Sequence, residues 1–82
     1  MKCVICGEEI EGEYGNNPDP VRSEGRCCDV CNMKYVVPFR IIIAGIEDNN
    51  TRKDFTAMIN GFDQKGLDSC LEFITSDNKK EG

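Results

Sequence analysis

Four cysteines are the residues of this chain best suited to chemistry, because their spacing is that of metal ligands. They form two Cys-x-x-Cys pairs separated by twenty-one residues, Cys3 with Cys6 and Cys28 with Cys31. Thiolates bind zinc strongly, and two such pairs supply the four ligands of a tetrahedral site. The sequence therefore predicts one structural Zn(II) ion bound by these four side chains.

Two further cysteines bear on the choice of ligands. Cys27 directly precedes Cys28, and adjacent side chains of an extended chain point to opposite faces, so only one of the two can reach the metal. Cys28 gives the usual two-residue gap to Cys31 and is the predicted ligand, with Cys27 as the alternative. Cys70 lies on an apolar helical stripe and is expected to be a buried thiol.

Other uses of six cysteines fit the chain less well. Three disulfides need an oxidising compartment, and the first knuckle follows Met1 without a secretory signal, so we expect a reducing cytoplasm. A rubredoxin-like iron site has the same four thiolates, but the aromatic shell expected around it is missing, since the chain has no tryptophan and two tyrosines. A dithiol redox role also remains open, because each pair is a potential dithiol.

The remaining composition argues against an enzyme. The chain has no histidine, which excludes imidazole chemistry. A zinc ion closed by four thiolates has no open position for water. The carboxylates of Glu8, Glu9 and Glu11 are interpreted as a solvated acidic face, and no phosphate-binding loop or Ser/His/Asp set is present. We therefore predict no catalytic residues.

Size and charge limit the class of partner. The chain has 82 residues and a formal net charge of −5. Four thiolates on one Zn(II) ion would bring this to about −7. A domain this small buries a modest core and needs a covalent or metal staple. The negative charge disfavours phosphate backbones, and no apolar run is long enough to span a membrane. A protein partner or a second copy of the chain is the expected partner.

The first half of the sequence predicts the turns, strands and helix that would position the cysteines. Gly7 follows Cys6 and allows the positive φ of a tight turn. Residues 21–22 and 26–27 are predicted to pair as a short β-hairpin across the turn at 23–25. The second cysteine pair then opens a helix whose apolar residues follow helical spacing: Val30, Met33, Val37, Ile41 and Ala44.

The helix and the second half complete the expected fold. Pro38 predicts a kink or a restart, and the run of isoleucines at 41–43 leaves a buried strand as an alternative to helix. A capping box at Thr51 and a second apolar stripe predict a further helix, and a last short helix is expected from Asp68 or Ser69. The second stripe comprises Phe55, Met58, Ile59 and Phe62. The last helix would use Leu67, Cys70, Leu71 and Ile74.

These elements give a fold class and a division of the chain. The expected class is a small α+β domain stapled by zinc, with a knuckle, a short β-hairpin, a helix and a C-terminal α-hairpin. Residues 1–46 form the zinc-binding module with its long helix, residues 47–75 form a helical hairpin packed on it, and residues 76–82 form a disordered tail.

Two resemblances extend this interpretation. A knuckle, a hairpin and a helix whose first turn supplies the second ligand pair resemble the treble-clef zinc fold, and residues 28–35 resemble the helix-opening knuckle of GATA-type fingers. Residues 1–40 are similar to small four-cysteine proteins carried by phages and prophages of bacteria. Three strings carry that second likeness: Cys3-Val4-Ile5-Cys6-Gly7, Tyr14-Gly15-Asn16-Asn17-Pro18 and Gly25-Arg26-Cys27-Cys28-Asp29-Val30-Cys31-Asn32.

The resulting functional hypothesis is an interaction protein with a structural zinc ion. The phage likeness implies an accessory or regulatory factor that acts by binding proteins. The alternative is a sequence-specific nucleic-acid-binding regulator, in which basic residues near the zinc knuckles gather on one face. Those residues are Arg22, Arg26, Lys34 and Arg40.

Overall fold

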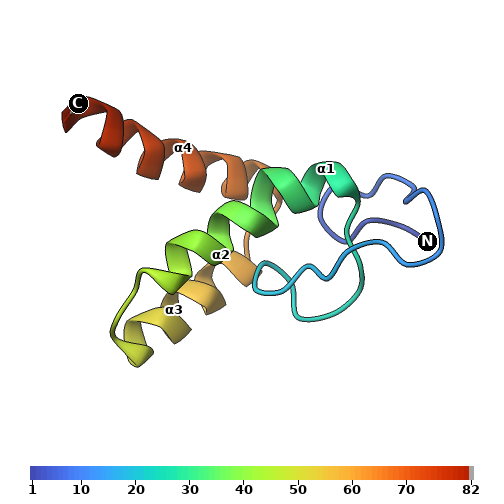
Figure 1. The fold of residues 1–82 in the computed structure, drawn as a ribbon, viewed down its shortest axis with the longest axis horizontal. Helices are drawn as coiled ribbons and strands as arrows, with labels where there is room; N and C mark the ends of the chain where they lie inside the picture. Colours follow the sequence, from blue (N-terminus) through green and yellow to red (C-terminus); the bar gives the residue numbers. More distant parts are fainter. Residues whose placement is uncertain (82) are drawn as a thin grey trace.

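Over residues 1–81, the chain forms a small helical protein with a compact core and three helices (Figure 1). The computed structural model describes the backbone of residues 1–81 and the side chains of residues 1–75. A loop-rich segment of residues 1–28 precedes the helices. The first helix is continuous and has three parts: α1 (Asp29–Cys31), a π-helical turn η1 (Asn32–Val36) and α2 (Val37–Ala44). The other two helices are α3 (Asn49–Asn60) and α4 (Gln64–Glu81).

The helix over residues 29–44 begins at a cysteine and passes through a proline without a break. The Sγ of Cys28 accepts a hydrogen bond from the Cys31 N–H, and the acid Asp29 lies in the first turn. The Val37 N–H bonds to the Asn32 carbonyl, five residues back, which widens the turn directly before Pro38. The proline, which has no N–H and a bulky ring, is accommodated by this wide turn. The isoleucines at 41–43 are helical, so the strand alternative is wrong.

The predicted β-hairpin does not form within the part of the chain that the structure describes. Residues 18–22 form a turn instead, in which the N–H groups of Val21 and Arg22 both donate to the Pro18 carbonyl. Cys27 pairs with Asn16 through two backbone hydrogen bonds of 2.9 Å, an isolated bridge. The residues predicted to form the hairpin therefore make other backbone contacts. The fold is helical and does not belong to the expected α+β class.

The second half forms the expected pair of helices with different boundaries. The cap of α3 is Asp48, whose carboxylate accepts a 2.8 Å hydrogen bond from the Thr51 N–H, so the capping box predicted at Thr51 is wrong. Gly61 ends α3, whereas Gly66 lies inside α4. A Cβ atom at Gly66 would lie 3.0 Å from the Phe62 side chain, so this glycine allows the two helices to turn closely.

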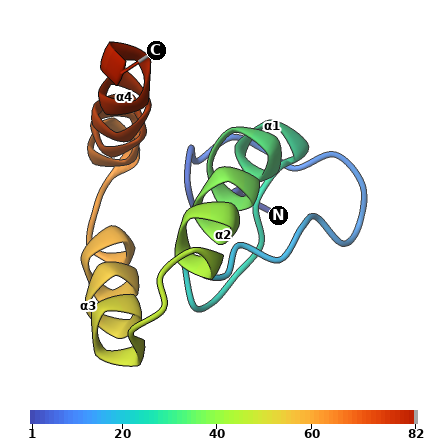
Figure 2. The same ribbon diagram turned by 60° about the vertical axis from the view of Figure 1, so that its left-hand side comes forward.

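The core lies where the first helix packs between the other two helices and the N-terminal segment. Figure 2 shows α3 and α4 on one side of α1 and α2, and the N-terminal loops on the other. The larger side chains with no exposed surface come from all of these parts: Val21, Tyr35, Val36, Phe39, Ile59 and Leu67. Phe39 and Phe55 rings lie 6.0 Å apart in a tilted arrangement, which joins α2 to α3.

Helix α4 packs on the core near its start and then projects away from it (Figures 1 and 2). Leu67 is buried, whereas Leu71 and Ile74 are half-buried. The helix continues to Glu81, but the side chains of residues 76–82 lie outside the described part of the chain. The disordered tail expected there therefore stays a prediction. Among the described helices, none is long and apolar enough to cross a membrane.

Candidate metal centre

The structure brings the four predicted ligands together at one point. The sulfur atoms of these cysteines all lie within 4.8 Å of one another, and the Sγ atoms of Cys6 and Cys28 are 3.8 Å apart. Around a tetrahedral zinc ion with bonds of roughly 2.3 Å, neighbouring sulfurs are about 3.8 Å apart. The cluster thus has the size needed to hold one metal ion and is consistent with a zinc-binding site.

The first knuckle supplies two ligands from a tight turn. The Ile5 and Cys6 N–H groups point at the Cys3 Sγ, at 3.4 Å and 3.5 Å. Gly7 closes the turn at φ +80°, as predicted, and its N–H donates to the Cys3 carbonyl over 3.0 Å. These N–H groups stabilise a negative sulfur, which is the form that binds metal.

The second knuckle supplies its ligands from the start of α1. The Cys31 N–H points at the Cys28 Sγ over 3.4 Å, in the manner of a helix cap. Cys31 is buried and Cys28 half-buried, so the cluster closes one end of the core. Since free N–H groups at a helix start favour negative charge, this position also suits thiolates. The N-terminal loops and the first helix therefore meet at the cluster.

The thiol pKa values differ within the cluster. Burial raises the pKa of Cys3, but the N–H groups of Cys6, Cys28 and Ile5 lower it more, and the net result is a pKa of about 6. Burial, followed by the neighbouring thiols of the cluster, raises the pKa of Cys31. The Cys3 thiol therefore ionises more easily than the Cys31 thiol, and a bound metal ion would take the place of the Cys31 proton.

Cys27 lies outside the cluster, on the core side of the chain. Its side chain has no exposed surface, and its backbone is paired with Asn16. Burial, and then the charges of Cys3 and Cys28, raise its pKa to about 11. This agrees with the choice of Cys28 as the ligand. Cys70 is half-buried on α4 among apolar neighbours, and burial raises its pKa.

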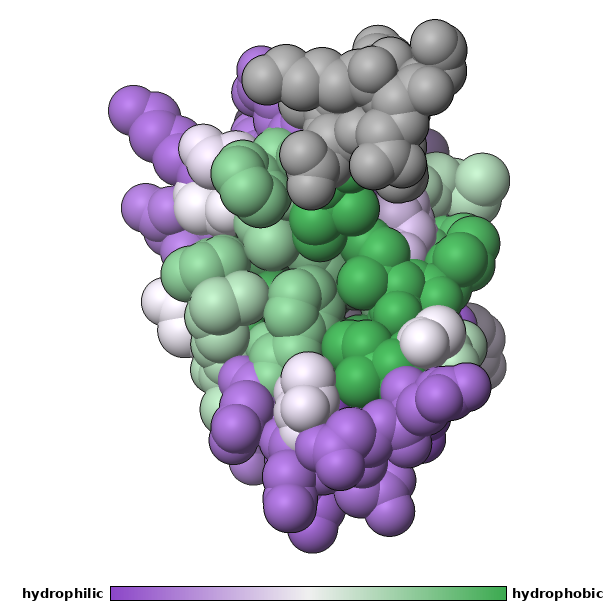
Figure 3. Space-filling view, turned by 90° about the vertical axis from the view of Figure 1, so that its left-hand side faces the viewer, coloured by the Kyte–Doolittle hydropathy of each residue, from purple (hydrophilic) through white to green (hydrophobic). Residues whose placement is uncertain are grey.

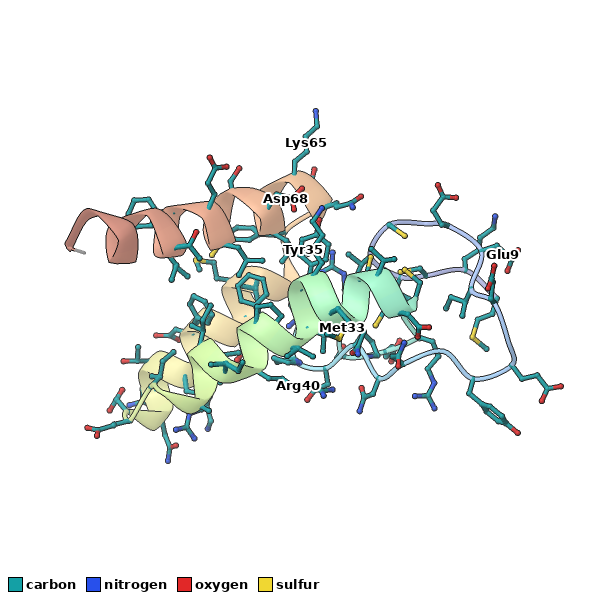
Figure 4. All side chains as sticks on the ribbon, turned by 45° about the horizontal axis from the view of Figure 1, so that its top comes forward. Glu9, Met33, Tyr35, Arg40, Lys65 and Asp68 are labelled. Carbon is teal, nitrogen blue, oxygen red and sulfur yellow. The ribbon has the colours of Figure 1, made fainter. Side chains whose placement is uncertain are left out.

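An open cavity borders the cluster and has an acidic rim. Cys6 and Cys28 line it, together with Lys34, Tyr35 and Gln64 from the helices. The three carboxylates interpreted as a solvated face stand on its rim and are exposed: Glu8, Glu9 and Glu11. Glu9, labelled in Figure 4, also accepts a 2.5 Å contact from the N-terminal amine of Met1.

Three of the four basic residues near the cysteines bind groups of the same chain. Arg22 donates to carbonyls at the end of α3, with 2.5 Å to Phe62. Arg40 donates to the carbonyls of residues 17 and 19, and Lys34 lies 3.7 Å from the Asp68 carboxylate. Three of the four basic side chains expected to gather on one face for nucleic-acid binding therefore contact groups of their own chain instead.

Sequence reasoning did not identify these anchoring contacts. Arg22 joins the N-terminal segment to α3, and the Asn60 amide returns a 2.6 Å hydrogen bond to the Pro20 carbonyl. The partners are about forty residues apart in the chain, and no local pattern relates them. The available signal was an arginine next to a valine, an apolar residue, in a loop otherwise rich in turn residues.

No family model, curated protein or solved structure matches this chain. The four-cysteine cluster therefore identifies a kind of site without identifying a family. Of the features that resembled a treble clef, the knuckle and the helix start with its two cysteines are present, and the hairpin is absent from the residues that the structure describes.

Proposed function

We propose that this protein is a non-enzymatic interaction module whose fold depends on one structural Zn(II) ion. The convergence of four sulfurs within 4.8 Å is the observation that supports it. An all-thiolate site is closed and structural, whereas catalytic zinc sites keep a position for water. Binding free energies of roughly 10–16 kcal/mol for structural zinc in finger peptides match or exceed the net stability of a domain this small.

The surface that would bind a partner protein is the apolar face between α4 and the α2–α3 pair. Figure 3 shows apolar side chains gathered on one face of the molecule, with polar residues at its lower end. The side chains proposed to line it are half-buried apolar residues of the three helices and of the α3–α4 connection: Ile42, Phe55, Phe62, Cys70, Leu71 and Ile74. Because α4 projects from the core, it leaves this face without a full intramolecular cover, which suits an apolar helix of another protein.

The proposed biological setting is that of a phage or prophage accessory factor in the cytoplasm. This setting rests on the likeness of residues 1–40 to small four-cysteine phage proteins. The alternative, a nucleic-acid-binding regulator, has less support, because the chain is acidic and Arg22, Lys34 and Arg40 contact groups of their own chain. A gel shift at two salt concentrations tests it, since phosphate binding is strongly salt-dependent.

Elemental analysis and partner capture test the main proposal. We expect one zinc and no iron per chain, and capture of a protein from the native host by the zinc-loaded protein. The variant Ile74→Glu should lose that protein while retaining zinc and helical content. Phe73→Glu, on the same helix at an exposed position, is the matched control and should retain it. Absence of zinc, or equal capture by both variants, would contradict the proposal.

A further inference from the structure

The apolar residues that predicted the first helix lie on its outer side. Val30, Met33 and Ile41 are 69%, 68% and 68% exposed, Ala44 is also exposed, and Val37 is half-buried between them. The core uses the opposite side, as Figure 4 shows with Tyr35 directed toward α4 and Met33 away from it. These five side chains, here termed the outer ridge, run about 21 Å along the helix.

The outer ridge has a symmetric order of residues. Counting outward from Val37, an apolar residue stands four positions away on each side, Met33 and Ile41. Another stands seven positions away on each side, Val30 and Ala44. In a two-fold symmetric interface, residue i of one copy contacts residue j of the other, and j contacts i. Two antiparallel ridges centred on Val37 would therefore place apolar side chains against apolar side chains along their whole length.

Charged neighbours do not obstruct such a contact. Lys34 is directed toward Asp68 on α4, and Arg40 toward the carbonyls of residues 17 and 19. Both basic side chains beside the ridge are thus bound to their own chain. Asp29, the acidic residue before Val30, accepts a 2.8 Å hydrogen bond from the Asn16 amide. The charged side chains of this helix beside the ridge therefore each have a partner in their own chain, so an interface there would not bury an unpartnered charge.

The exposed apolar surface of the ridge favours association. Val30, Met33 and Ile41 are large apolar side chains that each keep about two thirds of their surface in water. Association of two copies through the ridge would remove these side chains from water.

We propose that two copies of this chain form an antiparallel dimer through the outer ridge, with the two-fold axis at Val37. Met33 of each copy then faces Ile41 of the other. This interface is separate from the apolar face proposed above for a partner protein, which lies between α4 and the α2–α3 pair. The two proposals can therefore fail independently.

Light scattering and sedimentation of the zinc-loaded, reduced protein test the dimer. The wild-type chain should be dimeric at micromolar concentration. Met33→Lys and Ile41→Glu should each weaken the dimer on the order of 100-fold, because each places two unpaired charges in the interface. The double variant should restore it, because Lys at 33 then faces Glu at 41 of the other copy. Within one chain these positions are eight residues, or about 12 Å, apart, beyond helical pair spacing.

Phe73→Glu is the control, because Phe73 is 73% exposed on α4 and lies outside the ridge. It should leave the dimer unchanged, and all variants should retain zinc and helical content. A wild-type monomer at every concentration would overturn the proposal. So would a dimer that survives Met33→Lys, one that Phe73→Glu breaks, or a double variant that stays monomeric.

Discussion

Tyr35 donates a 2.5 Å hydrogen bond from its hydroxyl to the Asp68 carboxylate, and this contact fastens α4 to the helix that carries the second ligand pair. The Gln64 amide donates to the same hydroxyl over 3.3 Å. The ring has no exposed surface, and burial, followed by the hydrogen bond to Asp68, raises the pKa of the phenol, so the hydroxyl stays protonated and remains a donor.

Removal of this hydroxyl should loosen α4. We expect Tyr35→Phe to lower the unfolding free energy by about 1–2 kcal/mol, because Asp68 and Gln64 lose a buried partner. Urea unfolding of the zinc-loaded protein measures the change, and amide exchange should show faster opening of α4. Lys34→Ala is the control, since its exposed ion pair with Asp68 should contribute little. Equal loss in both variants would contradict this account.

Removal of the metal should unfold the chain. The four sulfurs join the loop segment to the start of the first helix, and the core is too small to replace that constraint. A strong chelator at neutral pH should abolish most of the helical circular dichroism, and added Zn(II) should restore it. Retention of the spectrum and of the melting temperature after complete zinc removal would contradict the metal-dependent fold.

Serine variants of the two adjacent cysteines should show which of them is needed for zinc binding. Cys28→Ser removes a sulfur of the cluster and should reduce zinc retention strongly, because four-thiolate coordination is lost. Cys27→Ser should retain one zinc per chain, with a stability loss of about 1–2 kcal/mol from its buried position. Elemental analysis after dialysis against a competing chelator measures both. Loss of zinc in the Cys27 variant alone would reverse the assignment.

Cys27 should also make the protein sensitive to alkali. Burial, and then the nearby thiolates, raise its pKa from 9.0 to about 11, so the folded state keeps the proton that the unfolded state releases. The stability from this group is complete below about pH 9 and is lost as pH rises toward 11. Melting temperatures at a series of alkaline pH values should fall more steeply for the wild type than for Cys27→Ser. Parallel curves would show that Cys27 does not titrate in this way.

The contacts of Arg22 should hold α3 against the N-terminal segment. Its guanidinium donates to the carbonyls of Ile59, Asn60 and Phe62, at the end of α3 and directly after it. Arg22→Met keeps the aliphatic stem and should lower the unfolding free energy by about 1.5–3 kcal/mol. Arg26→Met, at an exposed position on the same segment, should change it by less than about 0.5 kcal/mol. Similar effects of the two substitutions, measured by urea unfolding, would contradict the anchoring role.

The sequence by itself determined the features that depend on short spacing. Two Cys-x-x-Cys pairs specified the four-cysteine cluster, because a turn of that length presents two sulfurs on one side whatever surrounds it. Helical periodicity likewise identified the first helix and the existence of the C-terminal pair, but the last helix begins at Gln64 and is longer than the short helix expected from Asp68 or Ser69. A glycine after Cys6 predicted the positive φ that is observed.

Tertiary structure decided which side of the first helix is buried and whether the predicted hairpin forms. The hairpin at 21–27 was plausible locally, but Cys27 pairs with Asn16, and Arg22 is drawn to α3, so long-range contacts outweighed it. Periodicity revealed the outer ridge of the first helix but not its orientation, since both sides of that helix are apolar. Only the packing of Tyr35 and Phe39 against α3 and α4 placed the ridge outside, because burial depends on residues distant in the chain.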